Sequence, residues 1–264
     1  GINSKADGIT DALKAGLKEL ERVRRFGFTA SEYERARANY LQHLESAYNE
    51  RKSTKNIAYA EEYINHFLDN EPIPGIEYEY TTMNQIVPNI PVEAINQAIQ
   101  QSNLISDKNQ AIMIAAPDKE GIAVPTQEEV AALLKGMKDI QVEAYVDKVS
   151  NEPLMKETPK GGKIVSEKAD VLFGATELVL SNGVKVYLKK TDFKADQILM
   201  RAYSAGGTSL FDDKDALNFN RAIMNSVVAV GGLSNFSKID LDKMLAGKKV
   251  SLQANVSGTE ETLG

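Results

Sequence analysis

The sequence contains few side chains that could hold a metal ion. It has two histidines, His43 and His66, and no cysteine. A zinc hydrolase needs about three protein ligands, an open position for water and a carboxylate that accepts the proton of that water. Glu62 and His66 are four residues apart and share a helix face, so they could form one corner of a metal site; an ordinary hydrogen bond or weak ion pair is the alternative. We therefore expect no metal site and no catalytic residue within this chain.

The sequence also lacks the residue patterns that nucleophilic catalysis by cysteine or serine needs. The absence of cysteine excludes thiol chemistry and disulfides. A serine nucleophile needs a histidine base and an orienting acid, and no Gly-x-Ser-x-Gly sequence occurs. Ser204 precedes Ala205-Gly206-Gly207, but no second element supports it. These glycines are expected to allow a tight strand-to-helix connection rather than to bind a phosphate.

The composition is that of a soluble globular protein of one large or two medium domains. Of 264 residues, 42% are hydrophobic and 26% are charged, with a net charge of −6 and a pI near 5.2. An acidic surface repels phosphate backbones, so we expect no nucleic-acid partner. No apolar run is long enough to span a membrane. The compartment stays open; a periplasmic or cell-envelope location is favoured over the cytoplasm.

The first part of the chain, residues 1–150, is predicted to be a helix-rich α+β domain. Apolar residues recur every three or four positions over 9–23, 33–48 and 57–67, the pattern of amphipathic helices. Thr29-Ala30-Ser31-Glu32 and Thr126-Gln127-Glu128-Glu129 are capping boxes that start helices. The apolar run Ala111–Ala116 is short and is followed by Pro117, which predicts a buried strand.

Residues 151–172 are polar and contain prolines and glycines, which predicts a linker between domains. After it the hydrophobic period becomes two. Ser181-Asn182-Gly183 is a strong hairpin turn between two predicted strands. Further strands are expected at 197–203 and 250–256, with a helix at 214–230 between them. We therefore interpret 173–264 as a second, partial α+β domain.

Several motifs resemble those of the pitrilysin/insulinase family of zinc peptidases. Leu180-Ser181-Asn182-Gly183-Val184-Lys185-Val186 is similar to the hairpin that opens a domain in this family, and the glycine-rich run at 200–208, the following helix and Gly231-Gly232 match the order of elements after it. In the first part, similar motifs are Glu19-Leu20-Glu21-Arg22-Val23-Arg24, Gly27-Phe28-Thr29, Asn56-Ile57-Ala58 and Glu71-Pro72-Ile73-Pro74-Gly75.

The zinc motif of the family is absent from the helix predicted at 214–230. His-x-x-Glu-His should fall on Asn218-Phe219-Asn220-Arg221-Ala222. Asn218 then replaces the first ligand, Arg221 the general base and Ala222 the second ligand. We expect these positions to be polar positions in contact with solvent. The alternative is that Arg221 contacts a substrate carboxylate or a facing domain.

The resemblance implies two related domains, each an antiparallel sheet packed against helices, with the second one truncated. Residues 1–150 would be the back of an active half and 173–264 the front of an inactive half. The chain would then be a non-catalytic section of a zinc metalloendopeptidase, inactive alone, that forms chamber wall and hinge around peptide or unfolded substrates. Zinc is expected in the parent's N-terminal domain, and the remaining domains of the same protein are the other partners. The alternative is a catalytically dead structural or peptide-binding subunit of the same fold.

Overall fold

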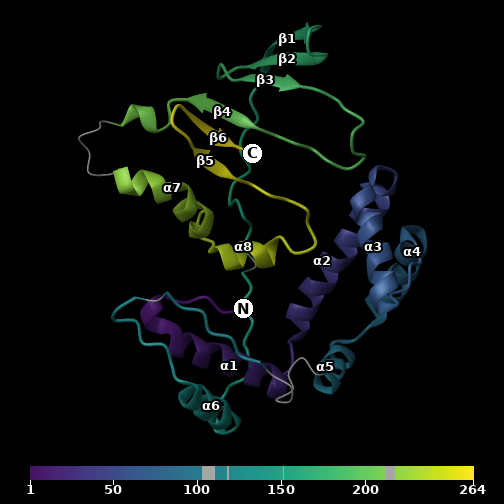
Figure 1. Ribbon diagram of the computed structural model, residues 1–264. Coiled ribbons are helices and arrows are strands. Elements are labelled where there is room, and N and C mark those ends of the chain that lie inside the picture. The colour runs from purple at the N-terminus through teal and green to yellow at the C-terminus, as the bar shows by residue number, and fades with distance from the viewer. Residues whose placement is uncertain (103–110, 118, 151, 212–217) are drawn as a thin grey trace. The chain divides into compact units, whose positions relative to one another are not determined.

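The structure is a computed structural model that describes residues 1–102, 111–117, 119–150, 152–211 and 218–264 (Figure 1). The side chains of residues 218–222 lie outside this description. The chain divides into two compact units, Gly1–Arg37 with Gln85–Lys148, and Ala38–Asn84 with Val149–Gly264. Helices and antiparallel sheets make up the structure, which confirms the α+β class. Within the described ranges, no helix has the length and apolarity needed to cross a membrane.

Helices form most of the regular structure before residue 140, as the apolar periodicity predicts. The α-helices here are α1 (Ile9–Phe26), α2 (Ala30–Asn49), α3 (Asn56–Asp69), α4 (Ile76–Ile86), α5 (Val92–Gln101) and α6 (Gln127–Gly136). Short 3-10 turns accompany them: η1 (Ala6–Gly8), η2 (Arg51–Ser53), η3 (Val87–Asn89) and η5 (Met137–Asp139).

Local sequence chemistry sets several helix ends. Gly27 ends α1 with a φ of 68°, a left-handed conformation that suits glycine, and its N–H donates to the carbonyl of Val23. In the first capping box, Glu32 N donates to Thr29 Oγ1 at 3.3 Å, and Thr29 N donates to Glu32 Oε2 at 2.9 Å. The second predicted box, at Thr126, is also present. Both capping-box predictions are confirmed.

Side chains from distant helices fix these ends in place. The Asn96 amide on α5 bonds both backbone groups of Phe28: Phe28 N donates to Asn96 Oδ1 at 2.8 Å, and Asn96 Nδ2 donates to Phe28 O at 3.0 Å. In the other unit, Tyr48 of α2 stacks on Tyr80 of α4 with ring centroids 4.2 Å apart. Arg51 lies over the Tyr48 ring at 4.1 Å, a cation–π contact. These contacts join helices that local sequence signals cannot connect.

The first sheet is an antiparallel meander in the order β1-β2-β3, formed by β1 (Ile164–Asp170), β2 (Ala175–Leu180) and β3 (Lys185–Leu188). The predicted turn at Ser181-Asn182-Gly183 joins β2 to β3, and Gly183 adopts a φ of 87°. Strand β1 lies inside the stretch 151–172 that was expected to be a linker, so the irregular connection ends before Ile164. The division into domains 1–150 and 173–264 stays a prediction.

The second sheet has the order β4-β6-β5, with β6 (Glu260–Leu263) pairing antiparallel to β4 (Ala202–Ala205) and β5 (Ala254–Val256). Both outer strands are shorter than predicted. Helices α7 (Asn218–Gly231) and α8 (Lys238–Met244) lie between β4 and β5 in the chain (Figure 1).

The strand predicted at Ala111–Ala116 is wrong. This segment joins no sheet, and its backbone has no hydrogen bond to any other described residue. Met113 is 92% exposed. An apolar run identifies a strand only where a neighbouring strand completes the hydrogen-bond ladder, and none of the described segments lies there to do so.

Candidate functional site

The motif order given above predicts that the zinc site of the pitrilysin/insulinase family would correspond to the connection from β4 to α7 in this chain. Gly206 and Gly207 follow the strand with φ angles of 146° and 60°, and the short 3-10 turn η6 (Gly207–Leu210) begins there. A Cβ atom on Gly207 would lie 2.5 Å from the carbonyl oxygen of Ser257. Only glycine fits so close to another backbone, so these residues make a tight connection, as the sequence predicts.

Glu261 of β6 holds this turn. Its carboxylate accepts hydrogen bonds from the Ser204 hydroxyl and, at 2.9 Å, from the Gly207 N–H. The hydrogen bond from Ser204, and after it the one from Gly207, lower the pKa of Glu261 below its usual value. Ser204 is therefore bonded to an acceptor that orients the turn, and no histidine of the described residues bonds to it. This arrangement does not support a serine nucleophile.

Asn225 attaches α7 to the outer edge of β5. Val256 N donates to Asn225 Oδ1 at 2.8 Å, and Asn225 Nδ2 donates to Val256 O at 3.0 Å. One side chain thus satisfies both outward backbone groups of Val256. Sequence reasoning missed this residue; the only signal was an amide within the apolar run of the predicted helix.

The three degenerate motif positions fall at the start of α7, where the backbone is helical. Helical spacing places positions 218, 221 and 222 on the same face as position 225. The side chains of Asn218, Arg221 and Ala222 lie outside the described residues, so their expected solvation stays a prediction. Asparagine, arginine and alanine at these positions do not supply the histidine nitrogens and carboxylate that a catalytic zinc requires.

His66, which the sequence pairs with Glu62, has a backbone partner further along the chain. His66 Nδ1 lies 2.6 Å from the carbonyl oxygen of Glu71, so the ring closes the end of α3. Across the part of the chain that the structure describes, no group of three or more His, Cys, Asp or Glu side chains is arranged to hold a metal ion.

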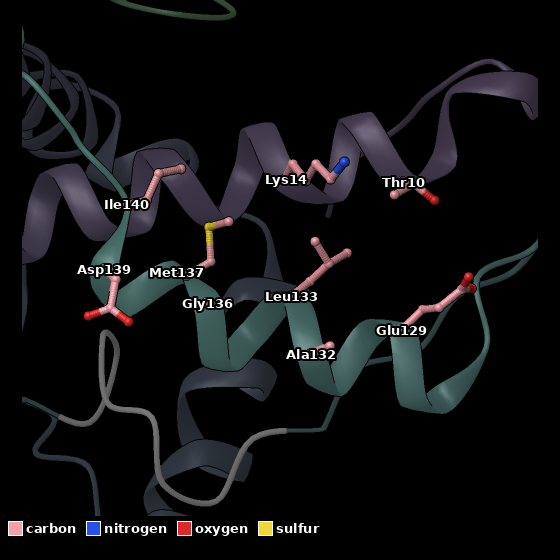
Figure 2. A pocket seen from close by; sticks show the side chains of 9 residues that line it. All are labelled: Thr10, Lys14, Glu129, Ala132, Leu133, Gly136, Met137, Asp139 and Ile140. Atoms are coloured by element: carbon pink, nitrogen blue, oxygen red, sulfur yellow. The ribbon is translucent and has the colours of Figure 1, made fainter.

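A groove of about 540 Å³ lies between α1 and α6 in the first unit. Figure 2 shows Leu133, Met137 and Ile140 on the α6 side, facing Thr10 and Lys14 on α1. Glu129 also lines the groove, but its carboxylate is bonded to the N–H of Thr126 in the second capping box. The groove thus combines an apolar wall with a carboxylate that the capping box already uses, and Figure 2 shows its second carboxylate, Asp139, at the opposite end of the groove from Glu129.

Comparison with known proteins finds relatives that are described as zinc proteases, each similar to this chain over a part of its own length. No model of a known protein family matches it. It is 30% identical over 254 residues to a zinc protease PQQL-like protein of Arabidopsis thaliana. The aligned region covers 93% of this chain and 26% of the relative. It is 24% identical over 265 residues to a probable zinc protease PqqL of Escherichia coli strain K12. The aligned region covers 99% of this chain and 28% of the relative.

Among solved structures, the crystal structure of the periplasmic protease PqqL from Escherichia coli aligns with 99% of this chain and 28% of its own, at 20% identity and a TM-score of 0.43. The chain spans about a quarter of the length of the curated relatives it matches. Over nearly all of its residues, the chain is therefore related to a segment of PqqL-like zinc proteases, and the predicted kinship with the pitrilysin/insulinase family is confirmed.

Proposed function

We propose that this chain is a non-catalytic section of a zinc metallopeptidase, in which it forms part of the wall of a substrate chamber and the hinge between two halves. The observation that carries the proposal is 30% identity to a zinc protease across 93% of a chain that has two histidines and no cysteine. A section of a zinc protease without the ligands for zinc contributes shape and substrate contacts, while the metal is held by the N-terminal domain of the parent. A periplasmic or cell-envelope location stays a prediction.

The second sheet supplies a surface on which a peptide could bind. Its order, β4-β6-β5, leaves β4 and β5 as edges, and Asn225 occupies the outer backbone groups of Val256 on β5. The outer side of β4 has no backbone partner among the described residues. An extended peptide that adds to β4 would be bound mainly through its backbone, which suits a peptidase with broad sequence preference.

The alternative function is a catalytically dead structural or peptide-binding subunit of the same fold. The two proposals differ in the rest of the parent protein. If the parent carries His-x-x-Glu-His ahead of the segment that matches this chain, the chamber-wall role holds; if it does not, the subunit role replaces it.

Zinc analysis and a peptidase assay test the proposed function directly. After exhaustive dialysis, the chain should retain well under one zinc per molecule and should cleave no fluorogenic peptide above background. One tightly held zinc per chain that is lost in His43→Ala or His66→Ala would overturn the assignment, as would chelator-sensitive turnover by the chain alone.

A further inference from the structure

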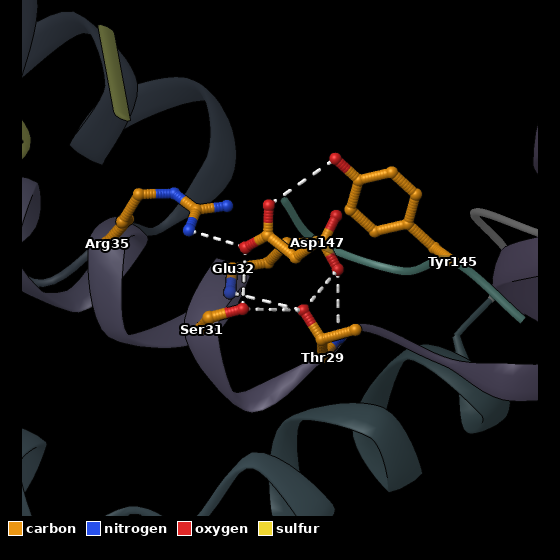
Figure 3. Close-up of polar contacts among 6 residues, drawn as sticks. All are labelled: Thr29, Ser31, Glu32, Arg35, Tyr145 and Asp147. Atoms are coloured by element: carbon orange, nitrogen blue, oxygen red, sulfur yellow. Dashed lines mark hydrogen bonds and ion pairs between the residues drawn. The ribbon is translucent and has the colours of Figure 1, made fainter. Parts of the chain in front are cut away.

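A polar cluster at the N-terminus of α2 holds a distant stretch of chain. The side chain of Asp147 is 4% exposed, although residues 141–150 form neither helix nor strand. Its Oδ2 accepts hydrogen bonds from Arg35 Nη1 and Ser31 Oγ, both at 2.6 Å (Figure 3). Tyr145 OH lies 3.5 Å from the other carboxylate oxygen. A nearly buried carboxylate with an arginine and a hydroxyl as donors is a strong, directional anchor.

The chain that leads to Asp147 is held in the same way. We call residues 138–147 the strap. Arg25 of α1 donates to the carbonyl oxygens of Lys138 and Ile140, both at 2.9 Å, and Arg22 donates to the carbonyl oxygen of Glu143 at 3.0 Å. Arginines of α1 thus bond the backbone of the strap, and Asp147 bonds its end to α2.

The chain changes character directly after the strap. From Val149 to Gly162, with residue 151 outside the description, the only hydrogen bond joins Glu152 N to Ser150 Oγ, and all described residues from 152 on are exposed. Order returns at Lys163, whose N–H donates to Ser181 Oγ and whose carbonyl accepts from Ser181 N at 2.8 Å. A connector of this length can span roughly 50 Å when fully extended.

We propose that Asp147 is the fixed end of the hinge. We call the hydrogen-bonded group of Asp147, Arg35 and Ser31 the latch. The latch keeps the strap bound to α1 and α2, so the flexible connector begins at Val149 instead of at the end of α6. Calling this connector a hinge rests on the proposed function; the anchoring of the strap does not. The residue acts by positioning the chain and has no part in catalysis.

Limited trypsin digestion, followed by mass spectrometry of the fragments, tests the latch. Lys148 lies beside it and Lys160 lies in the connector, so the ratio of their cleavage rates reports the local opening of the strap. In the unaltered chain, cleavage after Lys148 should be at least about tenfold slower than after Lys160. Asp147→Asn should raise the Lys148 rate about tenfold, equivalent to about 1.4 kcal/mol, because it removes the charge that strengthens both hydrogen bonds.

Arg35→Ala should raise the rate of cleavage after Lys148 similarly, and Arg35→Lys should raise it by less. Ser31→Ala should raise this rate mildly, and it serves as the test if the other variants disturb folding. Glu143→Ala is the matched control: it removes an acidic side chain from the strap but leaves the carbonyl that Arg22 uses. The proposal fails if Lys148 and Lys160 are cut equally fast in the unaltered chain, if the latch variants leave the ratio unchanged, or if Glu143→Ala acts like Asp147→Asn. None of these outcomes depends on zinc or peptidase activity, so failure of the latch is separable from failure of the proposed function.

Discussion

Replacing Gly207 by alanine should destabilise the second unit by about 2–5 kcal/mol. The backbone there has a φ of 60°, which costs an L-residue about 1–2 kcal/mol. The added Cβ would also lie 2.5 Å from Ser257 O and 2.6 Å from Glu260 N, both of which are backbone atoms that cannot rotate away. Overpacking of this kind costs about 1–3 kcal/mol more.

Gly174→Ala separates the two costs. Gly174 has nearly the same φ, 59°, but an added Cβ would meet nothing within 4 Å. Thermal unfolding followed by far-UV circular dichroism should therefore show a Tm about 2–6 °C lower for Gly174→Ala and about 5–15 °C lower for Gly207→Ala. Equal shifts for the two variants would refute the argument, because they would mean that the neighbouring backbone moves aside at little cost.

The other predictions concern the same unit. The triple variant N218H/R221E/A222H should take up zinc at most weakly and cleave no fluorogenic peptide, because it supplies two ligands and a base where a catalytic zinc needs about three ligands; chelator-sensitive turnover would contradict this. Glu261 has a lowered pKa, so its stabilisation is present above the ordinary value of 4.5 and is lost as pH falls through the lowered pKa; Glu261→Gln should be less stable than the unaltered chain near pH 7, with the gap closing in acid. Asn225→Ala should cost about 1–3 kcal/mol in urea unfolding, since it leaves the N–H and carbonyl of Val256 without their partner.

Features written in consecutive residues were predictable from the sequence. The capping box of Thr29 and Glu32 needs only four neighbouring residues, and the turn at Ser181-Asn182-Gly183 needs only a glycine that tolerates positive φ. The order of hairpin, glycine-rich turn and helix also made the family resemblance visible, whereas the placement of its zinc motif on Asn218, Arg221 and Ala222 stays a prediction.

Features that depend on distant partners were not predictable. Strand β1 has only Ile164, Val165 and Ala169 as apolar residues and follows a polar, linker-like stretch; its structure comes from pairing with β2. Ala111–Ala116 has the composition of a strand but lacks a neighbour among the described residues. The anchor between Arg35 and Asp147 joins residues 112 positions apart, and no local signal marks either as a partner of the other.

The bond pair between Asn96 and Phe28 has a consequence for the order of folding. It closes a loop between residues 68 positions apart, which costs on the order of 4 kcal/mol of chain entropy. Two hydrogen bonds, each worth about 1 kcal/mol, cannot offset that cost by themselves. They must therefore form after apolar packing has brought α5 and the end of α1 together. The hydrogen bonds of the Asn96 amide then form late in folding, so they slow the unfolding of the first unit and are not part of its folding nucleus.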